Sequence, residues 1–284
     1  MRAVTRVLDT ECDLNDIAGS DGYLFVRDGV GLAARGTAAV VDAANITAFL
    51  AEIERDDDVR QPGTGPVAIG VKPFDPASPW TLVVPAVVVG KGADGTKWVT
   101  RIDGADDALV AAPAPSPRIA SFGIRPGVSE ETYLAAVTAA RDAVRSGDIT
   151  KAVIARDVVV TSDRPIDVHA TLLRLRASFG SSYRYSVGGF IGASPELLVS
   201  RSGDTVRSHT LAGTAPRVGD PATDQRLAEA LIASTKNQIE HRIVIETVHD
   251  TLLPWCSYLD WEPEPSIVKV ANVQHLGTLV AGRL

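Results

Sequence analysis

Hydrophobic and polar positions alternate with two periods along the first hundred residues, and each period predicts a regular element. Residues 23–26 and 31–34 are largely apolar and flank Asp28-Gly29, a pair typical of tight turns, which predicts a β-hairpin. Apolar residues at helical spacing predict a helix over residues 45–55, with Ile46, Phe49, Leu50 and Ile53 on one stripe. Short apolar runs between Pro and Gly turns predict further strands at residues 67–71, 80–84, 87–89 and 97–102.

The second half of the chain mixes longer helices with strands. Ser129 is a typical N-cap and Gly147 a typical stop, so a helix is expected between them. We expect a second helix from Asp167 to Phe179, and the longest one from Pro221 to about Leu253. Strands are expected at residues 150–160, 183–187, 190–193, 197–201, 205–211 and 267–284. Because strands and helices occur in clusters rather than in strict alternation, the pattern favours an α+β sandwich over a parallel doubly wound sheet.

One segment has the composition of a linker. Pro113, Pro115 and Pro117 lie within residues 111–117, next to several alanines. We therefore expect an N-terminal lobe over residues 1–117 and a second part over residues 118–284.

Composition and charge narrow the class of protein. The chain has 284 residues, is 45% hydrophobic and 22% charged, and carries a formal charge of -7. This acidic balance argues against nucleic acid as a partner and means that an anionic substrate must be captured by local cations. The two cysteines, Cys12 and Cys256, are far apart and predict unpaired thiols in a reducing cytoplasm. The longest apolar run, residues 82–89, contains Pro85 and is too short to span a bilayer, so a cytoplasmic protein without a membrane partner is expected.

Two residues are candidates for acid–base chemistry. Lys151 begins an apolar strand on the face of Val153 and Ala155, where poor solvation would lower its pKa towards the range of a general base. A lysine that extends its amine into solvent from a strand end is the structural alternative, which the residue taken alone favours. Glu196 follows Pro195 after an apolar stretch, where its pKa would be raised as in a general acid. An exposed glutamate at a strand end explains it equally well.

Three further features are candidates for ligand contacts. Glu240 borders the apolar stripe of the longest helix, where it is either a Mg²⁺ ligand or the partner of Lys236 in a surface ion pair, and the spacing favours the pair. Leu211-Ala212-Gly213-Thr214 follows a strand and offers a backbone that a ligand can approach closely, or a generic turn. His275 can donate a hydrogen bond to an anionic substrate, or can be satisfied within the fold.

Taken jointly, five ordered stretches resemble the chorismate-utilising family, which includes isochorismate, salicylate, anthranilate and aminodeoxychorismate synthases. They are residues 151–156, 194–198, 211–217, 236–241 and 273–276, and residues 70–75 add a stretch like one in isochorismate synthases. The resemblance implies a chorismate-binding, anthranilate synthase component I-like fold, in which large antiparallel sheets are sandwiched by helices. It also assigns residues 118–284 as the catalytic core.

Within this family the resemblance is closest to isochorismate synthase. Members that add water carry a lysine at the position of Lys151, and Ala212 stands where aminodeoxychorismate synthases have a lysine. The resemblance implies that Lys151 activates water for attack on C2 of chorismate and that Glu196 protonates the departing C4 hydroxyl. Glu240 would bind Mg²⁺, and the substrate would contact Leu211, Ala212, Gly213, Thr214 and His275.

The chain also departs from the family pattern. It ends at Leu284, before the part of the family's sequence that supplies another Mg²⁺-binding glutamate, an arginine and a Gly-Ala-Gly loop. Position 237 is Asn, where some relatives have an acidic residue. We expect a monomer that can associate through a strand edge left open there. Two alternatives for the function stay open: a salicylate synthase and a non-catalytic chorismate-fold protein. The sequence also leaves open whether the product enters a menaquinone or a siderophore pathway.

Overall fold

The computed structural model describes residues 1–105 and 119–284, which form two compact units. The first unit contains residues 1–105 and 168–284, and the second contains residues 119–167. The expected linker at residues 111–117, and with it the expected boundary at residue 117, lies outside the described residues.

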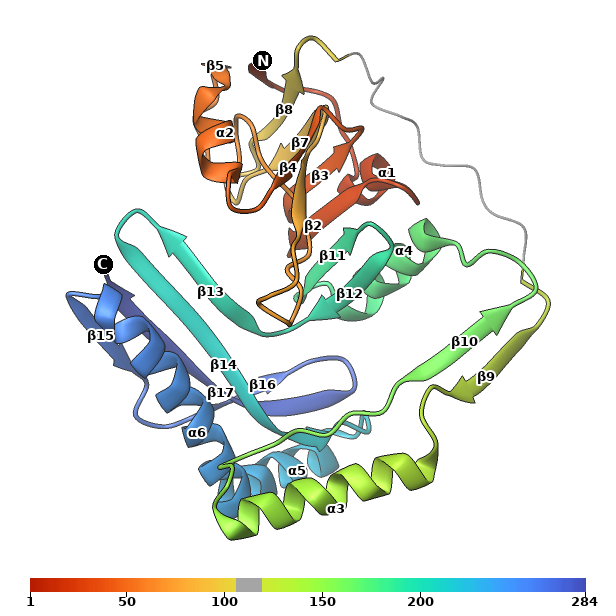
Figure 1. Ribbon diagram of the computed structural model, residues 1–284, viewed down its shortest axis with the longest axis vertical. Coiled ribbons are helices and arrows are strands. Elements are labelled where there is room, and N and C mark those ends of the chain that lie inside the picture. The colour runs from red at the N-terminus through yellow and green to blue at the C-terminus, as the bar shows by residue number, and fades with distance from the viewer. Residues whose placement is uncertain (106–118) are drawn as a thin grey trace. The chain divides into compact units, whose positions relative to one another are not determined.

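The N-terminal sheet of the first unit has eight strands in the described part of the chain (Figure 1). In spatial order these are β12 (Phe190–Ser194), β11 (Tyr183–Val187), β2 (Tyr23–Arg27), β3 (Val30–Arg35), β7 (Val87–Lys91), β8 (Lys97–Ile102), β1 (Arg2–Val7) and β5 (Glu54–Asp57). All neighbouring pairs are antiparallel except β1 with β5. The expected hairpin is confirmed as β2–β3, and the strand expected at residues 97–102 is β8.

One face of this sheet is covered by α1 (Leu14–Ala18) and α4 (Val168–Phe179). Leu24, Ala33, Val89 and Val99 lie opposite one another on successive strands and therefore share this face. They are all buried, in one cluster with Leu14 and Ile17 of α1 and Leu172 of α4. The core of this sheet is thus an apolar layer between strands and two helices.

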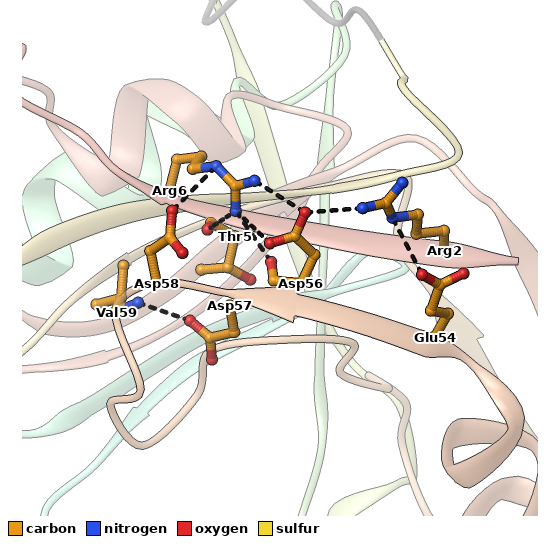
Figure 2. Close-up of polar contacts among 8 residues, drawn as sticks. All are labelled: Arg2, Thr5, Arg6, Glu54, Asp56, Asp57, Asp58 and Val59. Atoms are coloured by element: carbon orange, nitrogen blue, oxygen red, sulfur yellow. Dashed lines mark hydrogen bonds and ion pairs between the residues drawn. The ribbon is translucent and has the colours of Figure 1, made fainter.

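The outer edge of the N-terminal sheet is charged rather than apolar. Figure 2 shows Arg6 of β1 between Asp56 and Asp58 of the β5 edge, with nitrogen–oxygen distances of 2.9 and 3.2 Å. Arg2 also reaches Asp56, at 2.9 Å. Charges on an edge strand disfavour pairing with another chain. A small sheet of β4 (Ala39–Asp42) and β6 (Thr81–Val84) packs nearby with α2 (Ile46–Glu52), the helix expected at residues 45–55.

The C-terminal sheet of the first unit is built around two long strands, β14 (Thr205–Pro216) and β17 (Val273–Arg283). β13 (Leu197–Ser202) pairs with β14, whereas β15 (Tyr258–Trp261) and β16 (Ser266–Lys269) pair with β17. α5 (Pro221–Ala233) and α6 (Thr235–Leu252) pack on this sheet, and a short 3-10 helix (Leu253–Trp255) follows α6. Helices therefore cover parts of both sheets, and the expected α+β architecture with large antiparallel sheets is confirmed.

The second unit contains one helix and one strand pair in its described residues. α3 (Glu130–Ser146) begins at Ser129, whose side chain accepts a hydrogen bond from the Thr132 N–H. It ends at Gly147, which has a φ of 82° and takes the left-handed conformation of a C-cap, so both expected helix ends are confirmed. β9 (Phe122–Pro126) pairs antiparallel with β10 (Val158–Ser162).

Several expected elements are wrong or incomplete. The strand expected at residues 150–160 begins only at Val158, because β9 offers a pairing partner from that residue onwards. Residues 67–71 form no strand but a single bridge from Ile69 to Val83. The expected longest helix is two helices, because Ser234 takes an extended conformation and caps the end of α5 and the start of α6. The expected last strand is a hairpin of β16 and β17, and β1, α1, β4, β5, β9 and β15 were not expected.

Candidate functional site

Glu196 lies at the junction of β12 and β13, within reach of the neighbouring strand β14. Its Oε1 accepts a hydrogen bond from the Leu211 N–H at 3.1 Å, and its own N–H donates to Ser194 Oγ at 3.3 Å. The side chain is exposed, so the apolar surroundings expected from the sequence are not present in the structure. The carboxyl group is instead held in place by a backbone hydrogen bond beside residues 211–214.

Residues 211–214 are not a turn after a strand but the middle of β14. Gly213 has a φ of 76°, and the register with β17 shifts there, from Ala212 opposite Leu276 to Thr214 opposite His275. Such a bulge redirects side chains on the strand, and glycine permits it because it has no Cβ. Thr214 and His275 consequently meet side by side, with 3.0 Å between Oγ1 and Nδ1.

The bulge lies against the start of α6. A Cβ added to Gly213 would be 3.2 Å from Asn237 Cβ, so the strand and the helix approach closely at this point. Ser234 caps α6 by accepting a hydrogen bond from the Asn237 N–H at 3.3 Å. The Ser234 cap thus holds the first turn of α6 against the strand bulge that brings Thr214 to His275.

Glu240 lies on α6 one turn after Lys236. The Lys236 Nζ is 3.1 Å from Glu240 Oε1, and the exposed fractions of the two side chains are 78% and 33%. The ion pair that the spacing favours is therefore formed. No group of three or more His, Cys, Asp and Glu side chains that could hold a metal ion occurs in the described residues, so Glu240 is a single carboxylate rather than part of a preformed cluster.

His241, the next residue, was not assigned a role from the sequence. It is buried, and its Nε2 lies 2.8 Å from Thr278 Oγ1 on β17. This contact connects α6 to the second long strand. The position of His241 beside an apolar stripe was the available signal, but it could not show which polar group lies opposite.

A second buried polar network was also missed by sequence reasoning. Gln274, next to His275, is fully buried and donates from Nε2 to the Asp224 carbonyl oxygen at 2.9 Å. The Asp224 carboxylate accepts from the Val218 N–H at 2.7 Å and lies 3.4 Å from Arg217 Nε. These contacts fix the start of α5 to the ends of β14 and β17.

Lys151 belongs to the second unit. It is half-buried and lies in a stretch without regular secondary structure, because β10 begins seven residues later at Val158. The first unit brings together Glu196, immediately before β13, residues 211–214 of β14 and His275 of β17, and α6, the helix that carries Glu240, packs on β14.

A cavity of about 300 Å³ lies on another side of α6. It is lined by Ile239, His241, Arg242, Trp261 and Pro263, among others, and by none of the residues that the sequence indicated as a site. This cavity is therefore separate from the candidate site in the first unit. Among the described residues, every helix is too short or too polar to cross a membrane.

Comparison with known proteins gives consistent matches. Residues 81–284, more than half of the chain, match the family model described as chorismate binding enzyme. A candidate isochorismate synthase, MenF, of Mycobacterium tuberculosis is 36% identical over 235 residues, covering 78% of this chain and 59% of that protein. The isochorismate synthase DhbC of Bacillus subtilis is 30% identical over 230 residues, covering 77% of this chain and 54% of that protein.

A solved structure agrees with these relatives. The crystal structure of a candidate 2,3-dihydroxybenzoate-specific isochorismate synthase, DhbC, from Bacillus anthracis has a TM-score of 0.77 and 28% identity. The match covers 95% of this chain and 70% of that one. The chain thus spans somewhat more than half the length of the curated relatives above and about two thirds of this structure.

Proposed function

The chain belongs to the chorismate-binding enzyme family, and from this membership we propose that it catalyses the conversion of chorismate to isochorismate. The relatives named above support this reaction, since they are isochorismate synthases, and favour it over salicylate synthase. The protein would then be an isomerase. The names MenF and DhbC do not decide between a menaquinone and a siderophore pathway.

The observation that carries the proposal is the arrangement of Glu196, immediately before β13, with Thr214 of β14 and His275 of β17. Glu196 is anchored to Leu211 by a hydrogen bond, and the bulge at Gly213 places Thr214, three residues after Leu211, against His275. An acid and two hydrogen-bonding side chains therefore lie along one short segment. Such a segment can bind a small polar ring and transfer a proton to it.

The proposed reaction is an exchange of hydroxyl positions on the ring. Lys151, as a neutral amine, takes a proton from water while the water oxygen forms a bond to C2. The electrons of the double bonds shift along the ring, the bond from C4 to its hydroxyl oxygen breaks, and Glu196 gives that oxygen a proton so that water leaves. The proton gained by Lys151 replaces the one lost by Glu196 through solvent, so the net reaction is an isomerisation.

The remaining residues would bind and orient the substrate. The backbone of Leu211, Ala212 and Gly213 would line the ring, because a glycine at the bulge lets a ligand approach the strand closely. Thr214 and His275 would hydrogen-bond to oxygen atoms of the substrate, and they would then give up the hydrogen bond between their own side chains. We propose Glu196 and Lys151 as catalytic residues and these five as substrate-binding residues.

Mg²⁺ is proposed as the cofactor, with Glu240 as the residue that would hold it. Glu240 fits as one ligand, since it is a half-buried carboxylate whose ion pair in the described part of the chain is with the well-exposed Lys236. Mg²⁺ in proteins often takes one or two carboxylates and keeps its waters. When bound, the ion would neutralise charge on an anionic substrate.

Four further expectations stay predictions. They are a cytoplasmic location, a monomeric state, the absence of a nucleic-acid partner and the division at residue 117.

The test is turnover of chorismate by the purified chain with Mg²⁺, with the products separated by chromatography. Isochorismate is expected from the unmodified protein, and Glu196→Gln should lower kcat by about 10²–10⁴-fold, the usual contribution of a general acid. Glu262→Gln is a matched control, because Glu262 is also exposed and accepts a strand N–H, from Leu279 at 2.9 Å.

Two outcomes would contradict the proposal. Salicylate and pyruvate as products would favour salicylate synthase. A folded protein that binds chorismate without any turnover would favour a non-catalytic member of the family.

A further inference from the structure

A second cavity lies in the N-terminal sheet, and none of its lining residues belongs to the strands that carry residues 211–214 and His275. Its volume is about 220 Å³, and it is bounded by the sheet strands β2, β7 and β11 and by the helices α1 and α4. Three cationic side chains line it: Lys91, Arg176 and Arg184. The proposed function uses none of them.

The pairing of the strands explains why this cavity exists. Arg184 of β11 lies opposite Val26 of β2, Val26 lies opposite Gly31 of β3, and Gly31 lies opposite Lys91 of β7. Residues directly opposite one another share a face, so Arg184, Val26 and Lys91 stand in one row on the side covered by α1 and α4. Gly31 contributes no side chain to this row and leaves space between the two cations.

Arg184 is unusual because it is buried without a counter-ion. Its exposed fraction is 2%, and its Nη1 donates to Asn15 Oδ1 at 3.1 Å. Its Nε is buried and has no hydrogen-bond partner, and in the described ranges 1–105 and 119–284 no carboxylate oxygen lies within 4.0 Å of its guanidinium. A buried charge without a partner is strongly destabilising, which indicates that the fold retains Arg184 for a ligand.

The charges around Arg184 are not balanced by the protein. The nearest carboxylate in the cavity, Asp13, is bound by Arg176 and by the backbone and side chain of Asn15. Burial and then Arg176 lower the pKa of the Arg184 guanidinium, and Asp13 and Asp28 oppose this shift. Lys91 is half-buried and takes part in no ion pair among the residues that the structure describes. Among the residues that line the cavity, three cations therefore stand against one carboxylate.

We propose that this cavity binds a small organic dicarboxylate, with one carboxylate on the Arg184 guanidinium and the other near Lys91. The planar fork of an arginine fits a carboxylate with two parallel hydrogen bonds, and Nε is free to provide one of them. Leu14 and Val26 line the cavity between the charged groups and suit a carbon skeleton rather than an inorganic anion. The inference is independent of the reaction proposed for the other sheet.

Cys12 gives a direct readout, because it lines the cavity and is half-buried. The unmodified chain is alkylated with iodoacetamide at constant ionic strength, with increasing succinate or phthalate, and each cysteine peptide is quantified by mass spectrometry. Both dicarboxylates should slow alkylation of Cys12 in a saturable manner. Cys256, which is also half-buried but belongs to the other end of the chain, should react at an unchanged rate.

Variants then assign the binding groups. Arg184→Gln and Lys91→Met should each raise the half-protecting concentration about tenfold or more, since each removes a charge-assisted hydrogen bond. Lys269→Met, on the exposed β16 strand of the other sheet, is the matched control and should leave protection unchanged. Circular dichroism checks the fold of each variant, and Lys91→Met decides the question if Arg184→Gln does not fold.

Three results would overturn the proposal. One is the absence of protection by either dicarboxylate at millimolar concentration in the folded chain. Another is protection of Cys12 that persists undiminished in Lys91→Met. The third is equal protection by inorganic phosphate or by succinamide, which would mean that the cavity does not recognise two carboxylates on a carbon skeleton.

Discussion

The N-terminal and C-terminal sheets are held together by different kinds of contact. The N-terminal sheet buries a large apolar cluster against α1 and α4, which includes Leu14, Ile17, Leu24, Val89 and Leu172. The C-terminal sheet has a much smaller apolar cluster in the described residues, made by Ala215, Leu231 and Leu276. Both sheets bury polar groups, but in the C-terminal sheet these form a larger share of the buried residues, among them Thr210, His241, Gln274 and Thr278. One sheet is stabilised mainly by apolar burial and the other to a greater extent by hydrogen bonds.

This difference indicates how the two sheets divide their roles. Apolar burial is strong but has no direction, so it stabilises a layer without fixing individual side chains to a fraction of an ångström. Hydrogen bonds require defined geometry, and the contacts of His241 with Thr278 and of Gln274 with Asp224 surround the pair Thr214 and His275. We therefore expect substitutions in the N-terminal sheet to affect stability most, and substitutions in the C-terminal sheet to affect the site.

The largest expected effect is on the N-terminal sheet. Leu24→Ala should lower the free energy of unfolding by about 2–5 kcal/mol, because Leu24 has an exposed fraction of 1% and its removal leaves a cavity. Urea denaturation followed by circular dichroism measures this loss.

The adjacent residue is the control for that prediction. Phe25 points to the opposite face, is 54% exposed and stacks on Tyr183 with ring centroids 5.9 Å apart. Phe25→Ala should cost less than about 1.5 kcal/mol, the range for an aromatic pair. Equal losses of unfolding free energy in the two variants would contradict this prediction, because they would mean that the face of Leu24, covered by α1 and α4, contributes no more to stability than the exposed face of Phe25.

Local signals in the sequence were enough for much of the N-terminal sheet and for α3. The hairpin β2–β3 follows from Asp28-Gly29 between apolar runs, and α3 follows from Ser129 and Gly147. Each of these elements is specified by residues within a few positions of its ends. For such elements the pattern of residues and the folded structure agree.

Elements that depend on distant partners were not predictable in this way. Ser234 lies inside a continuous helical pattern, and it divides α5 from α6 where the two helices pack on β14 and β17. The apolar run after Lys151 has strand character, but a strand forms only from Val158, where β9 pairs with it. Arg184 has no local signal at all, since only the covering helices α1 and α4 make it a buried residue.

The candidate site shows the same limit. The motif around residues 211–214 indicated a backbone that a ligand can approach, but not that Gly213 would form a bulge within a long strand. That bulge depends on pairing with β17, more than sixty residues later in the chain. Glu196 was indicated as a candidate general acid in apolar surroundings, but the structure leaves it exposed, and its hydrogen bond with the Leu211 N–H could not be identified from the sequence.

A moderate effect is expected at the bulge of the C-terminal sheet. Gly213→Ala should cost about 1–2 kcal/mol, because a residue with a Cβ is strained at a φ of 76°. It should also change the NMR chemical shifts of the His275 ring and lower turnover, since the new Cβ would press on Asn237 at 3.2 Å.

Gly219→Ala separates these two consequences. Gly219 has a φ of 85°, and a Cβ there would meet nothing within 4 Å. It should therefore lose similar stability through strain while the His275 ring shifts stay as in the unmodified chain. If Gly213→Ala left those ring shifts unchanged too, the bulge would not be what positions Thr214 and His275.

The smallest effect is expected at the charged edge of the N-terminal sheet, where apolar burial plays no part. The hydrogen bond from Arg6 holds the pKa of Asp56 below its ordinary value of 3.8. A carboxyl group with a lowered pKa in the folded state stabilises the fold fully above its ordinary pKa, and this contribution is lost as the pH falls through the lowered one. Arg6→Met should therefore be slightly less stable than the unmodified chain at about pH 6, because exposed ion pairs contribute little.

The pH dependence of that small difference distinguishes charge from packing. Once the pH falls below the lowered pKa of Asp56, its carboxyl group is protonated and the ion pair with Arg6 is lost, so the denaturation midpoints of the two proteins should converge. Added salt at about pH 6 should bring them together in the same way, since it screens an exposed pair. If the denaturation midpoints still differed at low pH, Arg6 would stabilise the β1–β5 edge through the packing of its aliphatic chain. The edge would then be held by the same kind of contact as the apolar interior of its own sheet, despite its charges.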